Sequence, residues 1–467
     1  MADHAPLWTS KEIADACGGT LVGAPFEARG VTTDSRQTAP GDLFVALKGE
    51  RDGAAFAKAA LCAGAAGVVA ETGVEGPAIV VKDALAALTA LGARGRERAV
   101  GVRLAAITGS VGKTSVTQAV LAGLGRAGAA HGPVHSYNNH IGVPLTLARM
   151  PRSTPRAVIE IGMNHAGEIA PLSRLARPQT AAITNVGAVH TENFPDGVAG
   201  VAAAKAEIFE GLEGEGCAIL PADSPWFSYL AGAATKRGAR LRTFGEADGA
   251  NARLARFAAT KDGGAEVSAV IDGERIAFEL AQSAAHWGQM SLCVLLVLEA
   301  LGVERPCVLA ALGEFKPLAG RGQESRIALA GGAFTLIDES YNANPLSMVA
   351  ALASLAARKT KGRRIAALTD MLELGEKADA EHARLAEAIE EGGIDRVFVA
   401  GPLMEALWAR LPADRRGACA PCADELLTRL AEEIAPGDLV MVKGSKASRA
   451  FVLAEGLKAL GSGKGRA

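Results

Sequence analysis

The stretch Thr108-Gly109-Ser110-Val111-Gly112-Lys113-Thr114-Ser115 lies between a short apolar run and a helical pattern. A strand, a glycine-containing loop and a helix start, in this order, direct a row of backbone N–H groups at a bound phosphate. The two glycines let the backbone approach phosphate oxygens, Lys113 supplies positive charge, and the hydroxyl of Thr114 suits Mg²⁺. The stretch therefore predicts a phosphate-binding loop at the end of a buried strand.

The loop departs from the full phosphate-loop pattern at one position. The pattern has a further glycine five residues before Gly112, where this chain has Ile107. The alternative is a glycine-rich turn whose lysine is only solvated. Phosphate binding is favoured because Gly-Lys-Thr-Ser opens a helix directly after a strand with a buried pattern.

The chain has 467 residues, which is too long for one core and predicts about three domains. The apolar content of 49%, with 21% charged residues, is typical of a water-soluble globular protein. A net charge of −2 argues against a nucleic-acid partner, which usually requires a basic face. The N-terminus lacks a signal-peptide pattern, the apolar run 292–298 is too short to span a membrane, and the seven scattered cysteines suit a reducing compartment. We therefore expect a cytoplasmic protein with no membrane span.

Strand-like and helix-like segments alternate along the chain and predict an α/β fold. Residues 1–100 form a small α/β domain, 101–317 a central domain with buried parallel strands, and 318–460 a third α/β domain. A glycine-rich linker begins the third domain, and residues 461–467 are expected to be a disordered tail. The predicted strands are 30–33, 42–47, 78–81, 104–107, 157–161, 180–184, 216–220, 335–338, 364–368, 396–400 and 438–442.

Several reactive side chains lie at or beyond the ends of predicted strands, where open α/β sheets bind ligands. Glu160 ends a buried strand and offers oxygens to Mg²⁺, and its alternative role is to cap the next turn. His190 follows another strand, and a lone histidine is more often structural than a ligand. Lys205 lies in a helical pattern and, taken alone, is a solvated lysine. Asp338 begins a segment, 338–345, that is dense in hydrogen-bonding side chains.

Together these segments resemble the Mur ligases, the ATP-dependent amino-acid-adding enzymes of peptidoglycan synthesis. The resemblance covers nearly the whole chain. Two strings, Ser-Tyr-Asn-Ala-Asn-Pro at 340–345 and Asp-Met-Leu-Glu-Leu-Gly at 370–375, are similar to the branch that adds D-alanyl-D-alanine. The other matching segments are 33–36, 40–47, 108–115, 137–144, 160–164 and 442–445.

The resemblance implies a small N-terminal α/β domain for the UDP-linked substrate, a central P-loop ATPase-type parallel sheet and a C-terminal Rossmann-like domain. It implies ATP and Mg²⁺ as cofactors, with Lys113, Lys205 and His190 catalytic. Lys205 matches a lysine that is carbamylated in these enzymes, since reaction with CO₂ turns its cationic amine into an anionic carbamate that binds Mg²⁺. Thr114, Glu160 and His190 match the other metal-site residues.

Further residues match nucleotide and substrate sites of the family. Arg321, Asp338 and Asn342 match positions that reach the nucleotide from the third domain, in addition to the loop 108–115. The matches on the substrate side are Asp34, Ser35, Arg36, Asn138, Asn139 and His140.

The chain departs from the family in the helix expected to contact adenine. The family usually has His-Asn-x-x-Asn-Ala, whereas this chain has His286-Trp287-Gly288-Gln289-Met290-Ser291. Gln289 or another group is expected to replace the asparagine at position 290. Because ATP is held mostly through its phosphates, we expect altered base recognition rather than lost activity.

The implied reaction transfers the γ-phosphoryl group of ATP to the C-terminal carboxylate of UDP-N-acetylmuramoyl-tripeptide. The amine of D-alanyl-D-alanine then attacks the acyl phosphate, and we expect a monomer to catalyse both steps. One alternative is the ligase that adds the preceding amino acid to the UDP-dipeptide. Another is a nucleotide-dependent switch without ligase chemistry. The third peptide residue, meso-diaminopimelate or lysine, stays open because its side chain does not react.

Overall fold

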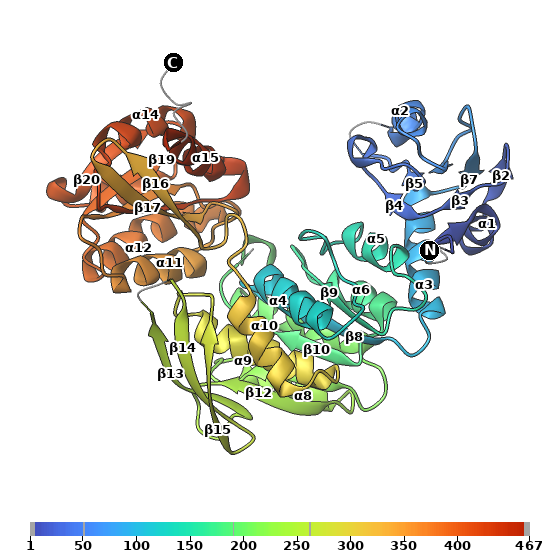
Figure 1. Cartoon of the computed structure of the whole chain (residues 1–467), viewed down its shortest axis with the longest axis horizontal. Coiled ribbons are helices and arrows are strands. Elements are labelled where there is room, and N and C mark those ends of the chain that lie inside the picture. Colours follow the sequence, from blue (N-terminus) through green and yellow to red (C-terminus); the bar gives the residue numbers. More distant parts are fainter. Residues whose placement is uncertain (1–4, 50–51, 190, 261–262, 462–467) are drawn as a thin grey trace.

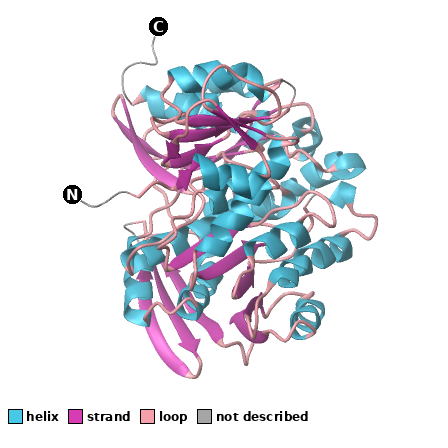
Figure 2. Cartoon of the chain, turned by 90° about the vertical axis from the view of Figure 1, so that its right-hand side faces the viewer, coloured by secondary structure: helices cyan, strands magenta, loops and turns pink. Residues whose placement is uncertain are grey.

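The computed structural model describes residues 5–49, 52–189, 191–260 and 263–461. The chain is a mixed α/β protein with three larger sheets, each packed against its own helices (Figure 1). The N-terminal sheet and the C-terminal sheet lie at opposite ends of the longest axis, with the central sheet between them (Figure 1), and Figure 2 views the chain along that axis. Every strand predicted from the sequence is present, so the α/β fold class is confirmed. The predicted tail at 461–467 lies, apart from Gly461, outside the described residues.

The first sheet has the strand order β2-β7-β6-β5-β4, in which only the β2–β7 pair is antiparallel. Its elements, with the separate β1–β3 pair, are β1 (Trp8–Thr9), α1 (Ser10–Cys17), β2 (Thr20–Val22), β3 (Glu27–Ala28), β4 (Gly30–Thr32), η1 (Ser35–Gln37), β5 (Asp42–Val45), η2 (Gly53–Phe56), α2 (Ala57–Cys62), β6 (Gly67–Ala70), β7 (Ala78–Val80) and α3 (Ala84–Arg98).

Helix α3 connects the first sheet to the central part of the molecule. Asp83 caps its start, because the Asp83 side chain accepts a hydrogen bond from the Ala86 N–H at 2.8 Å. It packs closely on α5 (Gly142–Ala148), because a Cβ on Gly92 would lie 2.8 Å from Pro144 O, and one on Gly95 would collide with Leu147 O. The absence of side chains at these two positions therefore permits direct contact between the helix backbones.

The central sheet has the order β15-β14-β13-β12-β11-β10-β8-β9. Strands β8 to β13 run parallel, and β14 and β15 extend the sheet as antiparallel neighbours. This extension was not predicted, although β14 carries its signal as an alternation of buried Ala265, Val267, Ala269 and Ile271. The strands are β8 (Arg103–Thr108), β9 (Arg156–Glu160), β10 (Thr180–Ile183), β11 (Cys217–Pro221), β12 (Arg240–Gly245), β13 (Ala252–Ala259), β14 (Ala265–Ile271) and β15 (Glu274–Leu280).

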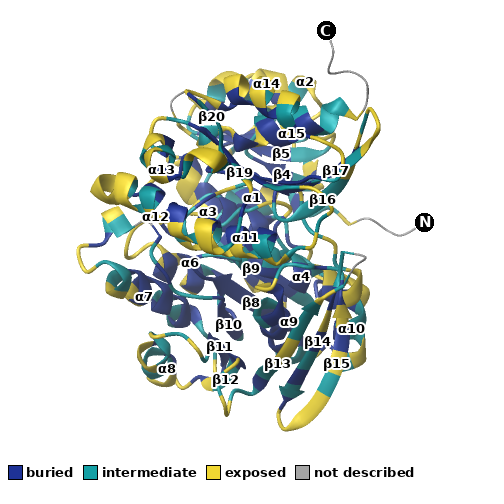
Figure 3. Cartoon of the chain, turned by 90° about the vertical axis from the view of Figure 1, so that its left-hand side faces the viewer, coloured by how far each residue is buried: buried dark blue, intermediate teal, exposed yellow. Residues whose placement is uncertain are grey.

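Helices cover both faces of the central sheet, as expected for buried parallel strands (Figure 3). One face packs against α4 (Lys113–Arg126), α9 (Trp287–Ala300) and α10 (Arg305–Glu314). The other face packs against α5, α6 (Ile169–Ala176), α7 (Val198–Ala206) and α8 (Phe227–Thr235). Short turns η3 (Thr191–Asn193) and η4 (Glu207–Gly211) flank α7.

The third sheet has the order β16-β17-β21-β18-β19-β20, parallel except for the β16–β17 hairpin. Its elements are β16 (Gln323–Leu329), β17 (Gly332–Glu339), α11 (Pro345–Ala357), β18 (Arg364–Thr369), η5 (Gly375–Lys377), α12 (Ala378–Glu391), β19 (Arg396–Ala400), α13 (Met404–Arg410), η6 (Ala413–Arg415), β20 (Arg416–Ala420), α14 (Ala423–Glu433), β21 (Leu439–Lys443), η7 (Lys446–Ser448) and α15 (Ala450–Leu460).

The third sheet touches the central one at several points beyond the linker. Leu346, at the start of α11, packs closely on Gly187. A Cβ added to Gly187 would collide with Cδ1 of Leu346. Ser283 donates to Glu324 Oε1 at 2.9 Å and accepts a hydrogen bond from Arg358, so it joins the two units. Within the described part of the chain, no helix has the length and apolar character that a membrane crossing requires.

Candidate functional site

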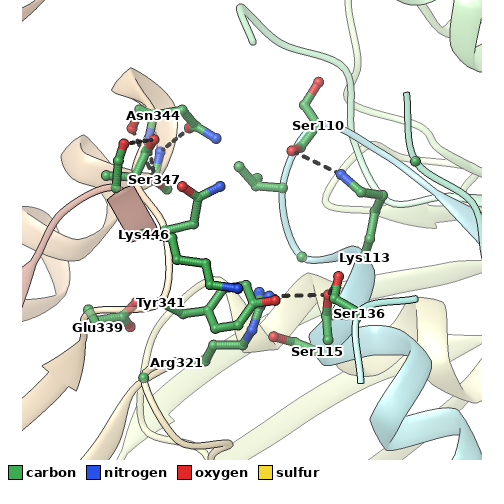
Figure 4. A pocket seen from close by; sticks show the side chains of 18 of the residues that line it. Ser110, Lys113, Ser115, Ser136, Arg321, Glu339, Tyr341, Asn344, Ser347 and Lys446 are labelled. Carbon is green, nitrogen blue, oxygen red and sulfur yellow. Dashed lines mark hydrogen bonds between the residues drawn. The ribbon is translucent and has the colours of Figure 1, made fainter. Parts of the chain in front are cut away.

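A cavity of about 650 Å³ lies where the carboxyl ends of the central and third sheets face each other. Its central wall consists of the segments that follow β8, β9 and β10, and its third-sheet wall of those that follow β17, β18 and β21. Figure 4 shows both sets of side chains pointing into the same space. This is the place that strand topology assigns to ligands in open α/β sheets.

The predicted phosphate loop forms one end of the cavity. Residues 110–115 line it, whereas Thr108 and Gly109 lie beneath the loop and are not among the lining residues. Gly109 has φ +153° and Gly112 has φ +81°, and a Cβ on Gly109 would collide with Thr184 Oγ1. Two glycines are thus required for the bend that turns β8 into α4.

Lys113 folds back over its own loop. Its Nζ donates to Gly109 O at 2.7 Å and to Ser110 O at 3.5 Å. The pKa of Lys113 lies below its ordinary value, because burial and the positive charge of Arg321 outweigh the opposite effect of Glu160. The lysine therefore lies where an anion, such as a terminal phosphate, would gain a positive partner.

Glu160 is the centre of a polar network on the central wall. Its Oε1 accepts hydrogen bonds from Thr114 at 3.0 Å, Ser136 at 3.0 Å and Asn138 at 2.7 Å. The residue is completely buried, and its Oε2 has no hydrogen-bond partner among the described residues. A buried carboxylate oxygen without a partner is costly unless a cation or water completes it.

This network fits a magnesium ion. Mg²⁺ prefers oxygen ligands and usually binds through one or two carboxylates, while water and substrate phosphates complete its shell. Glu160 Oε2 and the hydroxyls of Thr114 and Ser136 supply such oxygens beside the phosphate loop. The described residues contain no cluster of three or more His, Cys, Asp or Glu that could hold a metal alone. These oxygens are compatible with the metal role expected of Thr114 and Glu160, which stays a prediction.

Lys205 lies near the last turn of α7 and is 2% exposed. Burial and the neighbouring charge of Lys113 together hold the pKa of Lys205 well below its ordinary value. The lysine is therefore not the solvated side chain that its helical context alone suggested. His190, predicted as its partner in catalysis and metal binding, lies outside the described residues.

The third-sheet wall places cations beside the phosphate loop. Arg321 donates to Thr114 Oγ1 at 3.2 Å across the two units, and its guanidinium stacks 3.9 Å from the ring centre of Tyr341. Buried Lys443 donates to the main-chain oxygen of Asn342 at 3.0 Å and pairs with Glu339 at 3.5 Å. Arg321 and Asn342 both line the cavity, and their contact with the nucleotide stays a prediction.

Asp338 is not among the residues that line the cavity, and its expected contact with the nucleotide stays a prediction. Side chains alternate along β17, so Phe334, Leu336 and Asp338 share the face that packs on α15. One oxygen of Asp338 accepts from Ser340 Oγ at 2.5 Å and the other from Lys458 at 2.8 Å. The neighbouring Glu339 faces the cavity instead. Adjacent side chains of a strand point to opposite faces, so Asp338 faces α15 while Glu339 faces the cavity.

The predicted substrate residues are not all brought together. Asn138 lines the cavity, but Asn139 caps α5, accepting from the Ile141 and Gly142 N–H groups at 3.1 and 2.9 Å. His140 is exposed and outside the cavity lining. The group Asp34, Ser35 and Arg36 lies in the first sheet, where Asp34 caps η1 and pairs with Arg36 at 2.8 Å.

Helix α9 brings His286 and Met290 to the cavity. The Met290 methyl group covers Gly112 of the phosphate loop, since a Cβ on that glycine would collide with it. Gln289 points elsewhere, to Asp223 at 3.3 Å and Glu246 at 3.4 Å, so it does not take over the expected asparagine position. The pKa of His286 lies below its ordinary value, because burial and the positive charge of Lys443 outweigh the opposite effect of Glu339.

Sequence reasoning missed Ser136, His286 and Glu339 as individual site residues. Glu339 immediately follows Asp338, which the sequence analysis selected, and only the alternation of side chains along β17 distinguishes the two residues. Ser136 immediately precedes the segment 137–144. Its position two residues before Asn138 and Asn139 is the sequence feature that could have indicated it. His286 begins the helix in which the departure was noted.

Comparisons with known proteins agree with this architecture. The family described as Mur ligase middle domain matches residues 107–298, and the Mur ligase, glutamate ligase domain matches residues 325–446. The UDP-N-acetylmuramoyl-tripeptide--D-alanyl-D-alanine ligase of Escherichia coli (strain K12) is 35% identical, over 94% of this chain and 96% of that protein. The ligase of the same name from Bacillus subtilis is 32% identical, over 94% and 95%. The crystal structure of MurF from Acinetobacter baumannii aligns with a TM-score of 0.85 at 26% identity, over 97% of this chain and 99% of that one.

Proposed function

We propose, because this chain belongs to the Mur ligase family, that it joins D-alanyl-D-alanine to the C-terminal carboxylate of UDP-N-acetylmuramoyl-tripeptide and converts ATP to ADP and phosphate. The observation that carries this proposal is the cavity itself. It places a phosphate loop and an unpartnered buried carboxylate oxygen opposite a third-sheet wall that contains the strings 340–345 and 370–375. The reaction makes a peptidoglycan precursor.

The first step brings two anions together, a peptide carboxylate and the γ-phosphate of ATP. Their repulsion is the main barrier, and preorganised positive charge is commonly the largest catalytic contribution in such sites. Lys113 and Arg321 supply that charge from the two walls, and both lie within one hydrogen bond of the loop or of Thr114. Glu160, Thr114 and Ser136 would hold Mg²⁺, which neutralises phosphate charge when bound.

Lys205 supports the proposal through its low pKa. The neutral amine is the form that reacts with CO₂, and the buried position beside Lys113 disfavours the ammonium form. A carbamate on Lys205 turns the neutral amine into a negatively charged group and would provide an oxygen ligand for a metal. Lys205→Ala should be inactive and partly rescued by a short added carboxylate. Full activity of the variant without the added acid would reject the carbamate.

The first sheet is assigned to the UDP part of the substrate, through Asp34, Ser35 and Arg36. This group is absent from the lining of the cavity, so an elongated substrate would connect the first sheet to the site of chemistry. We assign the domains to residues 1–100, 101–317 and 318–460, with movement at the linker excluding water from the acyl phosphate. Solution scattering should show compaction when ATP and the UDP substrate are both present, and an unchanged envelope would count against closure.

The decisive experiment is mass spectrometry of products from UDP-tripeptide, ATP, Mg²⁺ and D-alanyl-D-alanine, with the tripeptide carrying either meso-diaminopimelate or lysine. The expected product is the UDP-pentapeptide, with phosphate release that requires the dipeptide. Product formation from UDP-dipeptide and a single amino acid instead would favour the preceding ligase of the pathway. Phosphate release independent of peptide and amine would favour a nucleotide-dependent switch. We further assign the protein to the cytoplasm, as a monomer.

A further inference from the structure

Lys446 is a cation of the cavity wall that neither the phosphate loop nor the expected metal site uses. It lies in η7 after β21, is exposed, and lines the cavity from the side of the third sheet. Figure 4 shows its side chain extending from that wall into the space between the two walls. Within the described part of the chain, no hydrogen bond or ion pair engages its Nζ atom. Its ammonium group is therefore available to an anionic ligand.

The backbone that carries Lys446 is fixed by the ends of two neighbouring strands. Ser445 N–H donates to Asp370 O at 3.1 Å, and Ser445 Oγ donates to Ala343 O at 3.3 Å. The same hydroxyl accepts a hydrogen bond from Leu372 N–H at 3.0 Å. The residue before Lys446 thus ties together the segments that follow β17, β18 and β21. The base of the lysine side chain is held in place before any ligand binds, while its ammonium end has no such restraint.

The other lysine and arginine side chains of the described cavity lining already have partners. Lys113 Nζ donates to main-chain oxygens of its own loop, and Arg321 donates to the first turn of α4. Lys443 is buried and pairs with Glu339 at 3.5 Å. Lys446 is the exposed member of this group, so it can turn toward an incoming anion without breaking an existing ion pair.

The incoming dipeptide brings such an anion. Its amine must reach the acyl phosphate beside the phosphate loop, and its C-terminal carboxylate lies up to about 7 Å farther along an extended dipeptide, about twice the reach of a single amino acid. The described cavity lining contains the acidic residues Glu160, Glu339 and Glu373, and the nucleotide adds further negative charge. A carboxylate that enters this space is repelled unless a cation receives it.

We propose that Lys446 binds the C-terminal carboxylate of the incoming D-alanyl-D-alanine and thereby selects a dipeptide acid as the acceptor. This rests on the proposed function. The lysine lies on the wall across from the phosphate loop, so a carboxylate held there leaves the amine end of the dipeptide directed toward the loop. Lys446 makes and breaks no covalent bond, and its contribution is to orient the nucleophile.

The experiment compares two acceptors, D-alanyl-D-alanine and its C-terminal amide, in the wild type and in Lys446→Met. With the wild type, the amide should show a KM about 30-fold above that of the acid, the scale of one hydrogen bond between charged groups. In Lys446→Met, the KM for the acid should rise by the same factor, whereas the KM for the amide should stay at its wild-type value. Lys446→Arg keeps the charge and should recover most of the preference for the acid.

Two controls separate this role from a structural one. Hydroxylamine has no carboxylate and traps the acyl phosphate as a hydroxamate, so Lys446→Met should form the hydroxamate at the wild-type rate, with unchanged KM for ATP and UDP-tripeptide. The matched variant Lys377→Met removes an exposed lysine of η5 that is outside the cavity lining. Its KM for both dipeptides should stay within about twofold of the wild type.

The outcomes distinguish this proposal from the proposed function. An unchanged KM for D-alanyl-D-alanine in Lys446→Met, equal losses with the acid and the amide, or slower hydroxamate formation would each overturn the assignment while wild-type ligation stands. A raised KM for ATP alone would place the lysine at the nucleotide and would overturn it as well. Wild-type protein that makes no amide from D-alanyl-D-alanine would overturn the proposed function and the assignment together.

Discussion

The two walls of the cavity are built on different principles. On the central wall, Thr114, Ser136, Asn138 and Glu160 bond to one another, and their network is largely buried before any ligand arrives. The third-sheet wall carries the Glu339–Lys443 ion pair and Arg321, which donates a hydrogen bond to Thr114 at the start of α4. From this difference we expect a preorganised phosphate and metal site on one side and a movable wall of cations on the other.

The largest effect is expected from the central wall. Lys113→Ala should lower turnover at least about 100-fold, the scale of losing one strong charge-stabilising contact. The control is Lys11→Ala, an exposed lysine on α1, which should leave steady-state kinetics unchanged. Near-normal turnover of Lys113→Ala would remove the phosphate loop from the mechanism.

Glu160→Gln tests whether the unpartnered oxygen marks the metal site. The substitution keeps the size of the side chain but removes its charge, so turnover should fall about 100-fold. The wild type should melt at a higher temperature when Mg²⁺ and a non-hydrolysable ATP analogue are added together, because ligands that bind the folded state stabilise it. That increase should be absent in Glu160→Gln and retained in Glu215→Gln, an exposed control. An equal increase in both variants would place the metal elsewhere.

A smaller effect is expected on the movable wall. Arg321→Ala should raise KM for ATP about tenfold, corresponding to one charge-assisted hydrogen bond of about 1.5 kcal/mol. Arg321→Lys keeps the charge but loses the planar stacking on Tyr341, so an intermediate value is expected. Arg326→Ala, exposed on β16, is the control. A loss of kcat equal to that of Lys113→Ala would show that the two walls are equally rigid.

The smallest effect concerns Asp338, whose side chain lies outside the cavity lining and pairs with Lys458. Burial lowers the pKa of Lys458, but hydrogen bonds to Asp338 and Glu455 raise it, and the net pKa lies above the ordinary value. A raised lysine pKa contributes stability below the unfolded-state pKa, and this contribution is lost as pH rises through the folded-state pKa. Asp338→Asn should therefore cost about 1 kcal/mol in urea unfolding at about pH 8 and less above about pH 11.

The matched control for this prediction is Glu455→Gln, which removes the exposed partner of Lys458 and should change stability little. KM for ATP should stay at the wild-type value in Asp338→Asn, since the side chain faces α15. A large increase in KM would restore the nucleotide role that the family resemblance implied.

Much of the architecture could be predicted because its signals are local. Continuously apolar strands such as 104–107 and 157–161 indicated a parallel sheet, which the structure confirms. Residues 110–115 of the predicted phosphate loop line a cavity at its carboxyl end, and phosphate binding there stays a prediction. The antiparallel extension β14–β15 was missed because a half-buried hairpin shows only a period-two pattern of small residues.

Features that depend on register or on contacts between distant segments could not be predicted in the same way. Whether Asp338 or Glu339 faces the cavity depends on which face of β17 packs against α15. The low pKa of Lys205 arises from burial and from Lys113, 92 positions earlier in the chain, so no local pattern reveals it. Gln289 was a reasonable substitute for the missing asparagine, but its helix turns it toward Asp223.

The central claim is that the cavity phosphorylates a peptide carboxylate before the amine attacks. The most direct measurement uses UDP-tripeptide labelled with ¹⁸O in its C-terminal carboxylate, together with ATP and D-alanyl-D-alanine. The account predicts that one labelled oxygen per turnover appears in the released phosphate, because the carboxylate oxygen bridges to phosphorus in the intermediate. Unlabelled phosphate accompanied by normal amide formation would contradict it.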